Sequence, residues 1–185
     1  MKPVTKVLTT WVFLLSLTSS VIPIAAQAAS KQELDIKVAA SIKQFESEVA
    51  GGKEFLKKAK GVLVFPEVLK AGFGIGGEYG EGALQIKGKN VDYYSTAAAS
   101  IGFQLGAQVK TIVLIFLEQS ALDKFRNSSG WEVGVDGSVA LIELGAGKDV
   151  NTMDIEDPIV GFVISNKGLM YNLTLEGSKI TKLNK

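Results

Sequence analysis

Glycines at a spacing that can bind phosphate occur near the middle of the chain. Gly72, Gly74 and Gly77 form the pattern G-x-G-x-x-G, which binds a dinucleotide when the glycines follow a strand and open a helix. Gly80 and Gly82 continue the run where that helix should begin, and each glycine costs a helix roughly 1 kcal/mol relative to alanine. The context therefore argues against a nucleotide site.

An extended strand offers a second explanation for these glycines. Side chains alternate between the two faces of a strand, so the glycines at 72, 74, 76, 80 and 82 share one face, which only Glu78 interrupts. A strand with one bare face permits tight curvature, or lets another segment lie almost directly on its backbone. We expect a structural glycine motif in a sharply bent sheet or small barrel. The motif comprises Gly72, Gly74, Gly76 and Gly77.

The chain contains neither histidine nor cysteine, and this restricts its chemistry. The commonest general base, the commonest metal ligand and every Ser-His or Cys-His nucleophile pair are missing. Glu78 and Glu81 fall on opposite faces of an extended strand, which argues against a shared acid–base site. The acidic residues between Asp149 and Asp157 lack the ligand spacing of an EF-hand and are interpreted as a solvated loop. We expect no catalytic residues, no metal site and no cofactor.

Lysines are concentrated in one short, partly apolar segment. This lysine cluster comprises Lys53, Lys57, Lys58 and Lys60, and Phe55 lies within it. A basic amphipathic helix can lie on a membrane, with its lysines near the head groups and its apolar side below them. At about 1 kcal/mol per lysine, charge alone gives weak and salt-sensitive binding, so Phe55 is the candidate apolar contact. Alternatively, Phe55 packs in the protein core and the lysines are simply solvated.

The overall charge is close to balanced, with 20 Lys and Arg against 19 Asp and Glu. Two of the lysines lie within the first six residues. The basic stripe that neutralises phosphates is absent, so nucleic acid is a poor candidate partner.

The first 28 residues have the pattern of a bacterial secretory signal peptide. Lys2 and Lys6 provide a charged start, residues 7–17 are mainly apolar, and Ala26-Gln27-Ala28 supplies the small residues of a cleavage site. A membrane anchor is the alternative, but the apolar stretch is too short to span a bilayer comfortably. We expect cleavage near Ala28, a periplasmic or secreted protein, and one domain at residues 29–185.

The elements that must position these residues are helices followed by strands. Apolar residues three and four apart predict an amphipathic helix at 30–49 and a shorter one at 53–60, and a third is expected at 118–126. Period-two alternation and short apolar runs predict strands from Gly61 onward. They are expected at 61–65, 101–109, 111–117, 131–144 and 159–165, the last forming a hairpin with 169–175. Tyr93, Tyr94 and Trp131 are expected as core or interface aromatics. The fold class is α+β, with N-terminal helices packed on a curved antiparallel sheet or small barrel.

Three segments, taken in order, resemble the SYLF domain family. They are KGVLVFP at 60–66, AGFGIGG at 71–77 and WEVGVDGSV at 131–139. The resemblance covers about residues 30–183, and the family includes eukaryotic membrane-trafficking and actin-patch proteins as well as secreted bacterial members. It implies a compact β-rich fold with helices, and lipid binding, best described for phosphoinositides in eukaryotic members.

An exported bacterial protein meets neither actin nor, ordinarily, phosphoinositides, so neither partner is carried over from the resemblance. We expect non-enzymatic binding of anionic phospholipid or of the membrane surface in the bacterial envelope. The alternative is a structural or protein-interaction module of the envelope without lipid specificity. No nucleotide is expected as a ligand.

Overall fold

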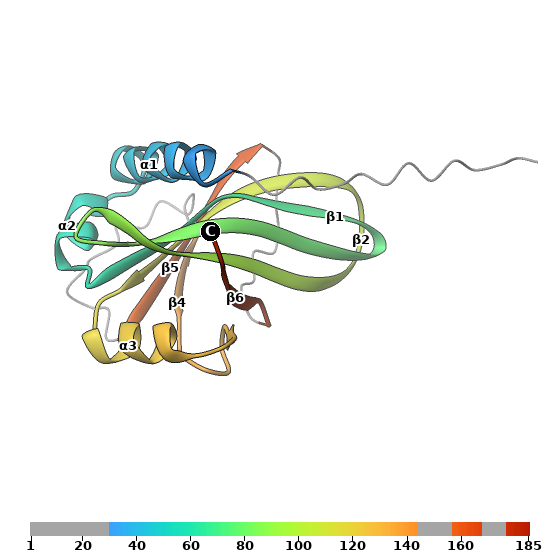
Figure 1. The fold of residues 1–185 in the computed structure, drawn as a ribbon. Coiled ribbons are helices and arrows are strands. Elements are labelled where there is room, and N and C mark those ends of the chain that lie inside the picture. The colour runs from blue at the N-terminus through green and yellow to red at the C-terminus, as the bar shows by residue number, and fades with distance from the viewer. Residues whose placement is uncertain (1–29, 144–156, 168–176) are drawn as a thin grey trace, which may run out of the picture.

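The computed structural model describes residues 30–143, 157–167 and 177–185 (Figure 1). The predicted signal peptide, most of the acidic loop and the predicted strand at 169–175 lie outside these ranges. So do the side chains at 73–75, 100–107, 143 and 165–167.

The described part of the chain contains three helices, each close to its predicted position. They are α1 (Lys31–Glu48), α2 (Gly52–Lys58) and α3 (Gln119–Asn127). The Ser30 hydroxyl accepts a hydrogen bond of 3.2 Å from the backbone N–H of Glu33 and thereby caps the start of α1. Leu34, Val38 and Phe45 form the buried side of α1, as their spacing predicts.

Within the described residues, six strands form one sheet. They are β1 (Gly61–Ile86), β2 (Lys89–Phe116), β3 (Trp131–Glu132), β4 (Ala140–Glu143), β5 (Ile159–Lys167) and β6 (Lys179–Leu183). The order is β3-β6-β2-β5-β4. Strand β1 pairs with the edge of β2 that lies opposite β5 and β6. Strands β5 and β6 pair with different parts of β2, at 109–116 and 93–97. The pairs are antiparallel except that of β4 with β5, which is parallel and departs from the antiparallel expectation.

The long hairpin of β1 and β2 folds back on itself. We call residues 61–70 and 108–116 the first arm, residues 78–86 and 89–98 the second arm, and residues 71–77 and 99–107 the bend. A Cβ atom added to Gly80 would lie 2.7 Å from the carbonyl oxygen of Glu67, and one added to Gly82 would lie 2.6 Å from the Phe65 ring. The second arm therefore rests almost directly on the backbone of the first. This arrangement confirms the expected curved sheet, and Figure 1 shows both strands turning at the end far from α2.

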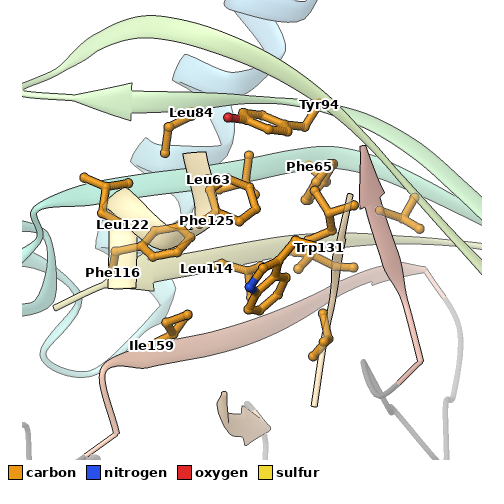
Figure 2. Packing of buried hydrophobic residues seen from close by; sticks show 14 of the residues in the cluster. Leu63, Phe65, Leu84, Tyr94, Leu114, Phe116, Leu122, Phe125, Trp131 and Ile159 are labelled. Atoms are coloured by element: carbon orange, nitrogen blue, oxygen red, sulfur yellow. The ribbon is translucent and has the colours of Figure 1, made fainter. Parts of the chain in front are cut away.

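Two hydrophobic clusters occupy the two sides of this folded sheet. The inner cluster lies between the arms and includes Leu63, Leu84 and Tyr94, together with Phe125 from α3 and Trp131 (Figure 2). The outer cluster joins α1 and α2 to the sheet, and the ring of Phe162 packs edge to face against Phe45 and Phe55, with centroids 4.8 and 5.1 Å apart.

Candidate functional site

The lysine cluster lies at one end of the molecule. Lys53, Lys57 and Lys58 project from α2 and Lys60 follows it; all four side chains are exposed. Glu54 is the only carboxylate among them, and within the described residues none of the four lysines forms an ion pair. Figure 1 places α2 at the end of the fold opposite the bend. The cluster can therefore present its charge to a flat anionic surface without the bend touching that surface.

Phe55 does not lie beside these lysines on the surface. Its ring is fully buried against Phe162, and Leu56 and Ala59 are half-buried at the edge of the same cluster. A fully buried ring offers no surface to a membrane. In this fold Phe55 anchors α2 to the sheet, and the expected apolar contact from this ring is replaced by core packing.

The bend contains the glycine motif. Gly72 pairs with Gly106 and Gly74 pairs with Gly102, and a register irregularity lies between these two pairs. A Cβ atom at Gly77 would make only an ordinary contact of 3.7 Å with the carbonyl oxygen of Ala98. Gly80 and Gly82, downstream of the motif, approach other backbone segments far more closely than Gly77 does.

A cluster of charged groups is enclosed where the second arm meets the first. Lys110 is 1% exposed, and its Nζ lies 2.5 Å from Oε2 of Glu78. Oε1 of Glu78 lies 3.2 Å from Nζ of Lys70. The two ion pairs join Glu78 of the second arm to both strands of the first arm, through Lys70 of β1 and Lys110 of β2. Such a buried pair depends on mutual neutralisation, because either charge alone would be strongly desolvated.

Sequence reasoning did not identify this ion pair. Its signal was present as two interruptions: Glu78 breaks the bare glycine face of β1, and Lys110 separates the two apolar runs of β2. Glu81 points away from Glu78, since its carboxylate accepts a hydrogen bond from the Tyr79 hydroxyl and pairs with Lys185. The two carboxylates therefore have different partners, as their opposite faces predict.

The tyrosines and the tryptophan predicted as core aromatics are buried. The Tyr93 hydroxyl donates a 2.8 Å hydrogen bond to Asp35 of α1, and burial, followed by this carboxylate, raises the pKa of Tyr93 to about 12. Burial, followed by the charge of Asp92, also raises the pKa of Tyr94 to about 12. Trp131 packs edge to face on Phe125, with ring centroids 5.6 Å apart. These rings hold helices onto the sheet.

The described ranges contain neither a metal-ion group nor a membrane-spanning helix. No group of three or more acidic side chains there is arranged to hold a metal ion. No described helix combines the length and the apolar character needed to cross a bilayer.

Comparison with known proteins finds a family match for the second half of the chain. Residues 97–185 match the family model Ysc84, described as Las17-binding protein actin regulator. The chain is also similar to the SH3 domain-containing YSC84-like protein 1 of Homo sapiens and of Mus musculus, each 27% identical over 128 residues. The match covers 66% of this chain but only 37% of either relative.

Proposed function

We propose, on the premise that residues 97–185 belong to the Ysc84 (SYLF) family, that this protein binds anionic phospholipid membranes and catalyses no reaction. The observation that carries the proposal is the exposed lysine cluster of α2 and Lys60, which lacks ion-pair partners among the described residues. The cluster supplies positive charge on a chain whose total charge is nearly balanced.

The strength of this contact follows from the number of charges. Each lysine near an anionic surface contributes about 1 kcal/mol, so four contribute at most about 4 kcal/mol, and Glu54 reduces that total. Such an interaction corresponds to a dissociation constant on the order of 1 mM. It is also screened over about 8 Å at physiological ionic strength. Binding through the lysine cluster is therefore reversible and sensitive to salt.

The compartment decides which lipids are available. If residues 1–28 direct export, the protein meets phosphatidylglycerol, cardiolipin and lipopolysaccharide in the bacterial envelope, and it does not meet actin. The family description names an actin regulator, but the proposed location separates this chain from such a partner. We therefore assign the lysine cluster to an anionic head group.

Charge reversal tests the proposal directly. The variant Lys53→Glu/Lys57→Glu/Lys60→Glu should lose binding to vesicles containing phosphatidylglycerol while its thermal stability changes little, because all three side chains are exposed. A matched control reverses three exposed lysines on α1, α3 and β6, namely Lys43, Lys124 and Lys179. This control has the same net charge and should retain most of the binding.

Equal binding by the two triple variants and the parent would overturn the role of the lysine cluster. Equal loss in both triple variants would show that only net charge matters. If the parent ignores every vesicle, a structural or protein-interaction role in the envelope becomes the better explanation.

A further inference from the structure

The bend of the β1–β2 hairpin is the second surface with a distinctive composition. We propose that the bend enters the head-group region of a lipid bilayer and makes an apolar membrane contact of its own, separate from the contact of the lysine cluster. This inference rests on the proposed membrane binding but not on the lysine cluster, since the two surfaces lie at opposite ends of the fold (Figure 1).

Large apolar side chains are exposed on either side of the bend. Leu69 at the end of the first arm is 49% exposed, and Tyr79 at the start of the second arm is 47% exposed. Their neighbours Val68 and Gly80 face inward and approach each other, so Leu69 and Tyr79 lie on the two outer surfaces of the folded hairpin. The small residues beside them, Ala71, Gly77, Ala97 and Ala99, are exposed as well.

Charge is absent from this part of the chain. Residues 71–77 of β1 and 93–109 of β2 contain no Asp, Glu, Lys or Arg, although 21% of the whole chain is charged. The charged residues that flank the bend, Lys70, Glu78 and Lys110, form ion pairs with one another: both lysines contact the carboxylate of Glu78, and of the three only Lys70 is partly exposed. The bend is consequently an uncharged end on a molecule whose other surfaces carry many charges.

A bilayer fits this shape better than a protein partner does. The exposed apolar groups lie on both outer surfaces of a narrow projection, and a fluid layer can surround a projection whereas a rigid protein usually contacts one face. Tyr79 also suits a membrane interface, because its ring is apolar while its hydroxyl is polar. The hydroxyl donates a 3.1 Å hydrogen bond to the carboxylate of Glu81.

The depth of this contact is limited by the backbone. In the described residues, β1 pairs only with β2, and β2 has no partner other than β1 at 99–107. Unpaired edge groups are not tolerated in the hydrocarbon core. The bend therefore reaches the boundary between head groups and acyl chains, about 5–10 Å deep, and goes no further.

Tryptophan fluorescence provides the test. Leu69→Trp and Tyr79→Trp, each in the exported protein, place a reporter on either outer surface, and Ile36→Trp provides a control on the outward side of α1, where Ile36 is 65% exposed. The buried Trp131 gives a constant background that the parent measures. Vesicles of phosphatidylcholine with and without phosphatidylglycerol are used, and sedimentation of each sample is followed in parallel.

We expect the emission of both bend reporters to shift to the blue on bound vesicles and to be quenched by lipids brominated near the head group, while the Ile36→Trp control stays unchanged. Sedimentation with anionic vesicles without any shift at the bend would overturn this inference and leave the proposed function intact. A shift at the bend with equal binding to neutral vesicles would support the bend and overturn the anionic preference. The absence of sedimentation with either vesicle would overturn both.

A loss-of-function variant gives an independent measurement. Leu69→Ser/Tyr79→Ser should lower vesicle partitioning by roughly tenfold, because two half-exposed side chains lose their transfer into an apolar environment. The melting temperature should remain close to that of the parent, since both groups are exposed. Ile36→Ser should leave both quantities unchanged, and a double variant that partitions like the parent would contradict the inference.

Discussion

Replacing Gly82 with alanine tests whether the second arm truly rests on the backbone of the first. The new Cβ would lie 2.6 Å from the Phe65 ring and 2.9 Å from the backbone carbonyl carbon of Val64, and closer still to the Val64 carbonyl oxygen. Overpacking of a core typically costs 1–3 kcal/mol. Since backbone atoms cannot move aside by changing rotamer, we expect a destabilisation near the upper end, about 3 kcal/mol.

Calorimetry or circular dichroism measures this change as a melting temperature. For a chain of this size, about 1 kcal/mol shifts the midpoint by roughly 2–4 °C, so Gly82→Ala should melt about 6–12 °C below the parent. Gly77→Ala is the matched control, because its Cβ would have only one ordinary contact of 3.7 Å. That variant should melt within about 2 °C of the parent. A Gly82→Ala variant that melts with the control would refute the close approach of the two arms.

Three further predictions follow from the buried groups and the N-terminus. Glu78→Gln leaves Lys110 buried beside a neutral partner and should lower the free energy of unfolding in urea by about 3–5 kcal/mol. The double variant Glu78→Met/Lys110→Met should lose less stability. A double variant less stable than the single variant would contradict this ion-pair argument. Because the pKa values of Tyr93 and Tyr94 are raised to about 12, the stability that these groups contribute is complete below about pH 10 and is lost as the pH rises toward 12; an ultraviolet titration of the folded protein should show late ionisation that Tyr93→Phe diminishes, and ionisation of all tyrosines near pH 10 would argue against it. Mass spectrometry of exported protein should find the N-terminus at or near Ala29, and retention of residues 1–28 would refute the export prediction.

The helices and the curvature of the sheet could be predicted because their signals are local. Residues three and four apart define the buried side of α1, and the bare glycine face of β1 predicted that another backbone would lie close to it. The structure shows such an approach at Gly80 and Gly82, two glycines of that bare face.

The lengths of β1 and β2 could not be predicted in the same way. The strand predicted at 61–65 continues past Pro66, which the structure accommodates in a register irregularity between Phe65 and Val68. Lys110 indicated a break between two strands, but burial against Glu78 lets one strand continue through it. Both features depend on residues that meet only after the hairpin folds back.

The composition of the candidate site was predicted more accurately than its geometry. The lysines of α2 are exposed as their pattern allowed, whereas the burial of Phe55 depends on the ring of Phe162, which lies far away in the sequence. Likewise, the parallel pairing of β4 with β5 could not be predicted from period-two alternation, which indicates a strand but not its partner.

Co-sedimentation of the exported protein with vesicles of defined charge tests the central claim most directly. We predict that the protein sediments with vesicles that contain phosphatidylglycerol, sediments less with phosphatidylcholine alone, and is released from the anionic vesicles as salt is raised. Protein that stays in the supernatant with every lipid composition, at low as well as high salt, would contradict the assignment of this chain as a membrane-binding protein.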